Sequence, residues 1–339
     1  MAGFFVSEVV VFESVITPFF DDLIVAFTDP KKRVFWGYLF LSLLIALAWI
    51  WWSSSEEKGR VLRDRLLNKS IWWSASARAD YAIFLLNRLA FLFIAPFLLT
   101  QLAVAQWLFE SLYDWIGHRP ILGESWSDLQ VMACFTLFYF LLDDFFRFYL
   151  HKLLHEVPWL WAFHKVHHSA RTLTPITVFR AHPVEGILFT LRTALVQGIS
   201  MALFIFFFGG RVDLITVLGA SLFAFLFNVT GSNLRHSHIA LGYGAFVERW
   251  LISPAQHQIH HSTNPVHFDK NYGVVLAIWD RLFGSLVYSK SGEVIEFGLQ
   301  KQQLPKEQNL LHIYLQPFRE CFNYFLSKIR KKEKSAINN

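Results

Sequence analysis

The stretch LQVMACFTLFYFLLDDFFRFYL at 129–150, followed at once by HKLLH at 151–155, decides the fold. Most of it is uncharged and long enough for a membrane-spanning helix, but Asp143, Asp144 and Arg147 interrupt its last two turns. Charges at membrane depth are rare unless they face a functional site or the interior of a helix bundle. The sequence therefore predicts a span that ends at a functional site.

The composition supports lipid as the solvent for part of the chain. Of the 339 residues, 54% are hydrophobic and 17% are charged, whereas soluble domains are about 25% charged. The 36 Phe and 13 Trp cannot all be buried in one soluble globule of this size. Two Cys and this hydrophobicity exclude a disulfide-stapled secreted module and a disordered chain.

Hydropathy predicts an all-α fold, a polytopic membrane bundle of four to five spans with a helical cap. The apolar runs 187–210 and 214–230 are broken by Gly209, Gly210, Arg211 and Asp213, so they are interpreted as a membrane hairpin. The predicted spans are 34–52, 89–109, 129–150, 187–210 and 214–230.

Loop charges predict the orientation. The loop 53–81 holds six Lys or Arg, the tail from 319 onward is basic, and the loop 110–128 is mainly acidic. Positive loops stay in the cytoplasm, so five crossings place every histidine cluster on the cytoplasmic side of an integral, multi-pass membrane protein. The net charge of +5 is interpreted as topology signals and contacts to anionic headgroups, not as nucleic-acid binding.

Three regions follow from this organisation. We expect an amino-terminal membrane region at 1–130, a catalytic domain at 131–290 that includes the membrane hairpin at 187–230, and a basic cytoplasmic tail at 291–339.

Histidine is the residue type that stands out, because 11 of the 14 His lie between 151 and 261. Ten of these eleven form four groups. The members are His151 and His155; His164, His167 and His168; His236 and His238; and His257, His260 and His261.

The spacing of these residues predicts two metal ions. On a helix, residues four apart share a face, and in a His-x-x-His-His triplet the adjacent pair diverges by about 100°. Each triplet can therefore bind one metal with one pair and approach a second metal with the other. Ten imidazoles exceed the four ligands of a closed zinc site. Without a metal they would incur desolvation and mutual repulsion, and nitrogen ligands suit Fe, Zn, Cu or Ni.

Other polar residues near these groups have open roles. His182 in RAHPVE is either a further ligand or a residue that supports the site or faces the substrate, whereas His118 and His312 are expected to be ordinary. Asp143, Asp144 and Glu185 are candidate acceptors that would orient ligand imidazoles. Arg180 is expected to pair with a carboxylate, to contact a lipid headgroup or to form a simple structural ion pair. The residues expected to form the loop and packing that close the cap are Asn271, Tyr272, Gly273, Trp279 and Asp280.

The motifs HKLLH, FHKVHH, RAHPVE, RHSH, QHQIHH and NYGVVLAIWDRLFGSL, over about 135–286, resemble the fatty acid hydroxylase superfamily, which includes sterol desaturases. The resemblance implies an oxygen-dependent, non-haem di-iron membrane enzyme whose cofactors are two iron ions and O2. Relatives often carry His-Ser-Asn at 236–238, so the role of His238 stays open. The catalytic residues it implies are His151, His155, His164, His167, His168, His257, His260 and His261, with His236 and His238 as further metal ligands.

The same resemblance implies a lipid or sterol-like substrate from the bilayer and a separate electron donor, of the ferredoxin or cytochrome b type with its reductase. Hydroxylation is expected over desaturation, because it needs one C–H bond near the metals and desaturation needs two held in sequence. A metal-binding membrane transporter is the alternative of another class, although its ligands should lie near the middle of the spans.

Overall fold

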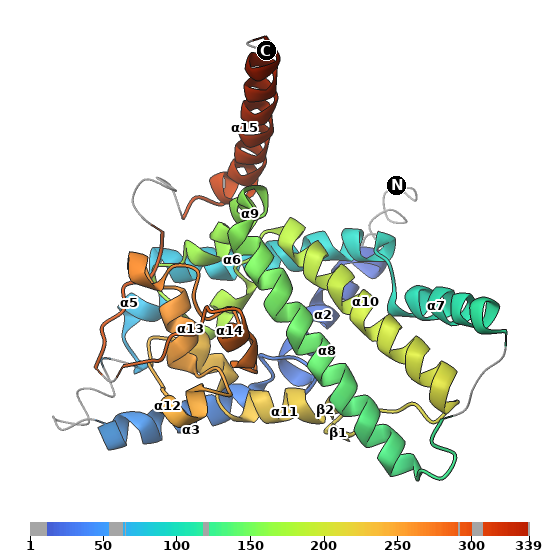
Figure 1. The fold of residues 1–339 in the computed structure, drawn as a ribbon. Helices are drawn as coiled ribbons and strands as arrows, with labels where there is room; N and C mark the ends of the chain where they lie inside the picture. The colour runs from blue at the N-terminus through green and yellow to red at the C-terminus, as the bar shows by residue number, and fades with distance from the viewer. Residues whose placement is uncertain are drawn as a thin grey trace, which may run out of the picture. The chain divides into compact units, whose positions relative to one another are not determined.

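The computed structural model describes residues 12–53, 64, 66–117, 122–290, 292–299 and 308–337. Within these residues the protein is almost wholly helical, with one two-stranded hairpin (Figure 1), which confirms the all-α prediction. The elements that the argument uses are α2 (Thr17–Thr28), α3 (Trp36–Ser53), α5 (Lys69–Trp72), α6 (Ala75–Ile94), α7 (Gln101–Ile116), α8 (Asp128–Glu156), α9 (Pro158–His168), α10 (Pro183–Phe208), β1 (Thr216–Val217), β2 (Ala220–Ser221), α11 (Leu222–Val229), α12 (Ala245–Glu248), α13 (Pro254–His260), α14 (Ile278–Leu282) and α15 (Leu310–Ile337). Short turns are η1 (Phe12–Ile16), η2 (Ala95–Phe97), η3 (Pro175–Phe179), η4 (Ser232–His236) and η5 (Pro265–His267).

Four helical segments in the described part of the chain are long and apolar enough to cross a membrane, and each overlaps one of the predicted spans. These segments are Trp36–Ser53, Ala75–Ile116, Asp128–Glu156 and Pro183–Phe208. The second is interrupted at η2, where Pro96 has no N–H for the helical ladder and the chain forms a 3-10 turn between α6 and α7.

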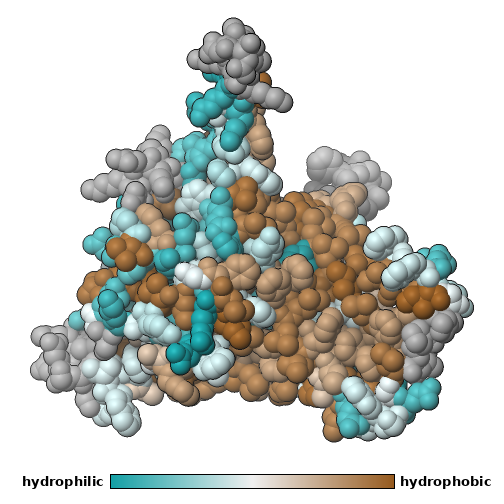
Figure 2. Space-filling view, in the orientation of Figure 1, coloured by the Kyte–Doolittle hydropathy of each residue, from teal (hydrophilic) through white to brown (hydrophobic). Residues whose placement is uncertain are grey.

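Their surfaces suit lipid. Trp52 at the end of α3 is 90% exposed, and Phe97 and Trp115 are 89% and 83% exposed. Hydrophobic side chains also cover much of the face that Figure 2 shows. Aromatic residues at helix ends are typical of membrane interfaces, so these exposed rings agree with a multi-pass membrane protein.

The fifth predicted span, 214–230, is wrong. The chain there forms the β1–β2 hairpin and then α11, whose eight residues cover only about 12 Å of a hydrocarbon core about 30 Å thick. Leu218 and Gly219 have φ of 51° and 77°, the left-handed conformations of a tight hairpin turn, and so the helix cannot be continuous. Hydropathy reports how apolar a segment is, and this one is apolar without being one helix.

The chain divides into two compact units. The first comprises residues 1–48, 88–147 and 187–233. In it α8 packs on α10 through the buried side chains of Val131, Phe135 and Phe204. The returning segment lies along α8, because the Ile215 amide donates to Thr136 Oγ1 at 2.9 Å and the ring of Phe223 stacks on Phe140 at 4.1 Å.

The charges that interrupt α8 are paired inside this unit. Asp143 accepts from Arg147 Nε at 2.7 Å and from Arg192 Nη1 of α10 at 2.8 Å. Two arginines on one carboxylate satisfy the ionic groups at membrane depth. Asp143 therefore joins α8 to α10, and its ion-pair partners within the described part of the chain are arginines and not histidines, contrary to the predicted supporting role.

The second unit comprises residues 49–87, 148–186 and 234–339. It holds the carboxyl end of α8, the short helices α9, α12, α13 and α14, and α15, which packs against α9. Ile83, Val166 and Ile313 form a buried apolar cluster among these helices. All of the histidine groups predicted from the sequence lie in this unit.

A glycine contact in the first unit is open to test. A Cβ on Gly198 of α10 would lie 2.5 Å from Val104 Cβ and 2.8 Å from the Gln101 carbonyl of α7. Gly198→Ala should therefore lower the free energy of unfolding by about 1–3 kcal/mol, the cost of overpacking a filled contact. Thermal unfolding in detergent measures it.

Gly210→Ala is the matched control, because a Cβ there meets nothing within 4 Å. Equal melting temperatures for the two variants would contradict the close approach of α7 and α10.

Candidate metal centre

Nine of the ten predicted ligand histidines meet in the second unit. They come from the end of α8, from α9, from η4 and from α13 with the residue that follows it. The helical boundaries create this meeting. Pro158 begins α9 directly after α8 because it has no N–H to give to the preceding helix, and Ser253 and Gln256 form a capping box that begins α13.

The nine histidines form two groups, and within each group one ligand atom per residue lies within 4.8 Å of the others. The first group is His151, His155, His164, His168 and His260; the second is His167, His236, His257 and His261. All are buried except His155, which is partly buried.

Each triplet is divided between the groups. His164 and His168, four residues apart on α9, belong to the first group, and His167 belongs to the second. On α13 the division is reversed: His257 and His261 belong to the second group, while His260 belongs to the first. This division agrees with the helical spacing, since residues four apart share a face and the neighbour points away.

Backbone carbonyls fix the tautomers in the first group. Nδ1 of His151 lies 2.8 Å from the Tyr272 carbonyl, and Nδ1 of His260 lies 2.7 Å from the Lys270 carbonyl. A carbonyl oxygen only accepts, so each Nδ1 carries the ring hydrogen and each neutral Nε2 holds a lone pair. These two Nε2 atoms are 3.0 Å apart. Two facing lone pairs repel each other unless a cation lies between them.

The Nε2 atoms of the second group also lie close to one another. Nδ1 of His167 donates to the Arg180 carbonyl at 3.2 Å, which leaves the lone pair on Nε2. That atom lies 3.1 Å from Nε2 of His236, which also lies 3.1 Å from Nε2 of His257. One ring nitrogen either donates one hydrogen or accepts along one lone pair, so hydrogen bonds alone do not suit all three.

Burial keeps the imidazoles neutral. It lowers the pKa of His164 and of His167 to about 3, and it lowers the pKa values of His168, His257, His260 and His261 well below the usual range. Around the last four residues, neighbouring imidazoles act in the same direction. Lone pairs are therefore available at neutral pH.

The donors fit a divalent transition metal in each group. Two nitrogens about 2.1 Å from one ion and roughly at right angles to each other are about 3.0 Å apart, and the observed Nε2 pairs are 3.0–3.2 Å apart. Neutral imidazoles suit iron, zinc, copper and nickel alike. The donor set therefore fits iron without selecting it.

Two predicted candidates lie outside both groups. His182 accepts from the Val184 amide through Nδ1 at 3.1 Å, and its Nε2 donates to the Tyr314 carbonyl at 3.1 Å. It thus caps the first turn of α10 and contacts α15. His238 lines a different cavity, beside Trp49 and Gln258.

Glu185 is a predicted acceptor that reaches a histidine, since its Oε1 lies 3.0 Å from Nδ1 of His164. The contact is close but lacks hydrogen-bond geometry, so Glu185 lies beside the His164 ring without accepting from its Nδ1. The side chains of both Glu185 and His164 are buried.

The sequence did not reveal the carbonyls of Lys270 and Tyr272. Asp280 accepts from the amides of Tyr272 and Gly273 at 2.8 and 2.7 Å, and a Cβ on Gly273 would lie 2.7 Å from Asp280 Oδ2. The loop is therefore held tightly, and it presents a carbonyl to His151. Every residue has a carbonyl, so residue type gives no signal for this contact.

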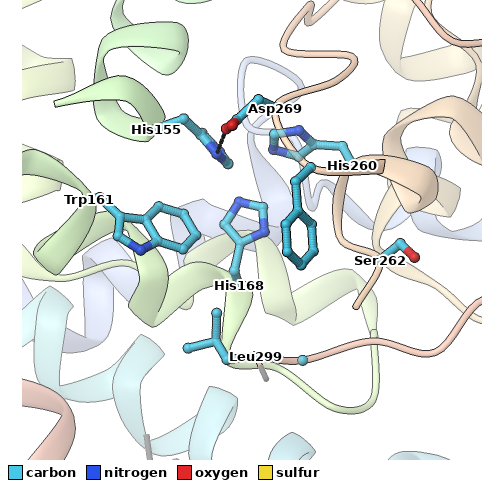
Figure 3. A pocket seen from close by; sticks show the side chains of 9 residues that line it. His155, Trp161, His168, His260, Ser262, Asp269 and Leu299 are labelled. Atoms are coloured by element: carbon cyan, nitrogen blue, oxygen red, sulfur yellow. Dashed lines mark ion pairs between the residues drawn. The ribbon is translucent and has the colours of Figure 1, made fainter. Parts of the chain in front are cut away.

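A cavity of about 220 Å³ adjoins the first group (Figure 3). No histidine of the second group lines it. His155, Trp161, His168 and His260 line it together with Ser262, Phe268, Asp269, Gly298 and Leu299. Asp269 Oδ1 lies 3.7 Å from Nδ1 of His155, and the Asp269 side chain is 64% exposed. A small molecule can therefore approach the first group through this cavity.

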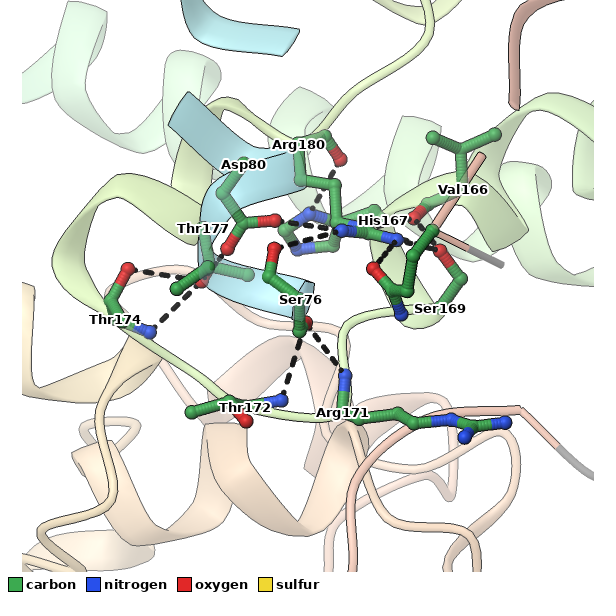
Figure 4. Close-up of polar contacts among 12 residues, drawn as sticks. Ser76, Asp80, Val166, His167, Ser169, Arg171, Thr172, Thr174, Thr177 and Arg180 are labelled. Atoms are coloured by element: carbon green, nitrogen blue, oxygen red, sulfur yellow. Dashed lines mark hydrogen bonds and ion pairs between the residues drawn. The ribbon is translucent and has the colours of Figure 1, made fainter. Parts of the chain in front are cut away.

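A buried ion pair supports the second group (Figure 4). Arg180 Nη1 donates to Asp80 Oδ1 of α6 at 2.8 Å, and both side chains are fully buried. Arg180 Nε donates to the Val166 carbonyl and to Ser169 Oγ, each at 3.0 Å. The same residue thus holds the end of α9 with its side chain and His167 with its carbonyl.

Comparison with known proteins gives the family. Residues 136–285 match the fatty acid hydroxylase family model. An alkylglycerol monooxygenase of Danio rerio is 30% identical over 162 residues, 47% of this chain and 32% of that protein. A lathosterol oxidase of Mus musculus is 28% identical over 186 residues, 55% of this chain and 54% of that protein. An ornithine lipid hydroxylase of Rhizobium tropici is 30% identical over 164 residues, 47% of this chain and 44% of that protein.

Residues 136–285 therefore form a domain of the fatty acid hydroxylase family. The matched part spans about a third to a half of the length of these relatives. No solved structure matches the chain.

The Asp80–Arg180 pair generates a stability prediction. Asp80→Asn leaves a buried guanidinium without its counter-charge, which costs about 3–5 kcal/mol, so the variant should unfold at a clearly lower temperature in detergent. Asp22→Asn is the matched control, because Asp22 pairs with Arg88 at a more exposed position, where such pairs contribute about 0–1 kcal/mol. Equal melting temperatures would contradict a stabilising buried pair.

Proposed function

We propose that the protein is a membrane-bound, non-haem di-iron oxygenase that hydroxylates a lipid or sterol-like substrate with O2. The observation that carries the proposal is the pair of adjoining imidazole groups within a fatty acid hydroxylase domain, one of them beside a cavity. The similar proteins also support it, because their names are those of a monooxygenase, an oxidase and a hydroxylase. A transporter has no such support.

The proposed ligands are the nine grouped histidines, with His151, His155, His164, His168 and His260 for one iron and His167, His236, His257 and His261 for the other. Iron with O2 supplies the oxidising power needed to break an unactivated C–H bond. His182 is assigned to the cap of α10, and His238 is not assigned as a ligand.

In this proposal the residues of the chain bind the substrate, orient the ligand imidazoles and exclude water from the cavity. Trp161, Phe268 and Leu299 give the cavity an apolar wall, which would hold an alkyl or ring segment of the substrate beside the first group. The carbonyls of Lys270 and Tyr272 keep the hydrogens of His260 and His151 on Nδ1, so that both Nε2 atoms face inward. Asp269, at the exposed side of the cavity, is the group placed to exchange protons with water.

Hydroxylation consumes one C–H bond, one O2, two electrons and two protons, and it yields an alcohol and one water. The two electrons would come from a separate donor, a ferredoxin or a cytochrome b with its reductase. Desaturation on the same site is the second candidate, and the lathosterol oxidase relative favours it. Desaturation needs two neighbouring C–H bonds held in turn.

We also propose that the histidine groups face the cytoplasm. The basic loop 53–81 and the basic tail favour this side. Two candidate helices, Ala75–Ile116 and Asp128–Glu156, separate that loop from the histidines of α9, so two crossings return the chain to the side of the loop.

Metal content tests the centre directly. The purified, loaded protein should hold close to two metal ions per chain, and His260→Ala should lose most of one, because it removes the Nε2 that lies 3.0 Å from His151. His238→Ala should keep both. Elemental analysis with protein quantification measures the ratio, and zero or one metal ion in active protein would refute the two-metal proposal.

Isotope labelling tests the reaction. Membranes that contain the protein, supplied with a reductase system and labelled O2, should incorporate one labelled atom into a lipid product. His164→Ala should abolish incorporation, because it removes a proposed ligand, whereas His312→Ala, outside both groups, should not. Mass spectrometry of the lipids gives the answer. Turnover that yields a new double bond without label would instead establish the desaturase.

A further inference from the structure

Helix α15 carries an apolar stripe that the rest of the described chain leaves exposed. The stripe consists of Leu311, Leu315, Phe318, Phe322, Phe325 and Ile329, which are 69%, 57%, 52%, 64%, 49% and 55% exposed. Spacings of four and three residues place all six on one face of the helix. In Figure 2 the visible side of α15 is largely hydrophilic, with hydrophobic atoms at its edge.

The opposite side of α15 already has a partner in the same unit. Ile313 is buried against Val166 and Ile83, and Lys165 of α9 pairs with Glu320. The stripe is therefore not the face by which α15 packs on α9, although the ring of Phe318 also touches Phe163 at its edge, at 5.3 Å.

Basic residues accompany the stripe. Lys328, Arg330 and Lys331 are exposed on the carboxyl-terminal half of α15, and no acidic residue lies between Glu320 and Glu333. A helix with Phe and Leu on one face and Lys or Arg on the others is typical of helices that lie in a membrane interface. Each such cation near an anionic surface strengthens binding about fivefold.

The contact of α15 with the segment that follows α8 agrees with a location at a membrane interface. Cys321 Sγ donates to the Trp159 carbonyl at 3.2 Å, and Trp159 lies three residues beyond the end of the candidate span Asp128–Glu156. The middle of α15 thus contacts the first turn of α9, which directly follows the candidate span. The headgroup region of a bilayer is expected at the end of a span.

We propose that α15 is a surface-lying membrane helix, whose stripe enters the headgroup boundary of a bilayer that contains anionic lipid. Three of the six stripe residues are Phe, whereas two-stranded coiled coils prefer Ile, Val and Leu at such positions. The basic residues would also repel their copies in a parallel pair. A lipid surface is therefore favoured over a second copy of the chain.

Spin labelling of the full chain tests this surface. In a Cys134→Ser and Cys321→Ser background, Phe322→Cys places the label on the stripe, and Asn323→Cys places it on the next residue, about 100° around the helix. In nanodiscs of phosphatidylcholine with phosphatidylglycerol, the label at 322 should be relaxed by lipid-soluble O2 and shielded from a water-soluble nickel complex. The label at 323 should show the reverse.

The charge requirement has its own variant. Neutralising three cations, with Lys328→Gln, Arg330→Gln and Lys331→Gln, should shift the equilibrium of α15 toward water by about a hundredfold, so that nickel relaxes the label at 322. Phosphatidylcholine alone should give a smaller shift in the same direction. Unchanged metal content in the variant shows that the fold and the centre are intact.

Two results would overturn the proposal. One is nickel access at 322 equal to that at 323 in the anionic discs. The other is strong spin–spin coupling between labels at 322 in discs that hold two chains, because it would show that a second copy covers the stripe.

Discussion

The rest of the site depends on one constraint, which is that buried imidazoles must present lone pairs to one another. Carbonyls at Tyr272, Lys270 and Arg180 keep the ring hydrogens of His151, His260 and His167 on Nδ1. The inward Nε2 atoms are then unprotonated, and burial opposes the second proton that would relieve their repulsion. A cation at each group removes this conflict, so metal binding and folding of the cap are expected to be coupled.

Buried ionic groups near the spans are also compensated, since a buried charge needs a partner of opposite charge. Asp143 satisfies Arg147 and Arg192 within the first unit, and Asp80 satisfies Arg180 within the second. The consequences differ. The Asp143 interactions join the apolar helices α8 and α10. The Asp80 interaction holds Arg180, whose carbonyl orients His167. Asp80 also lies outside the matched range 136–285, so α6 contributes to the support of a centre whose histidines all come from that range.

The two groups of histidines are unequal in surroundings. The first has five members, the carboxyl group of Glu185 beside His164 and a neighbouring cavity. The second has four members, and one of them, His167, donates to the Arg180 carbonyl. Substrate approach at the first group and structural support at the second would follow from this difference. Under the proposed function, the walls of the cavity and not the ligands would decide which C–H bonds of the substrate come near the metals.

The sequence by itself determined the elements whose signal is local and repeated. Apolar runs of sufficient length predicted four spans, and the helical spacing of the triplets predicted that each triplet serves two metals, because both signals are local. Which pair of His164, His167 and His168 shares a group was left open by the spacing. It failed for 214–230, where an apolar composition covers a hairpin turn at Leu218 and Gly219 and a helix of eight residues.

Only the tertiary structure decided which polar groups meet across long separations. Spacing could not exclude His182 or His238 from the metal groups, because their neighbours in space, such as Tyr314 and Gln258, come from distant parts of the chain. Nor could it identify the carbonyls that fix the tautomers, since a backbone oxygen has the same chemistry at every residue. Its effect depends on where the fold places it.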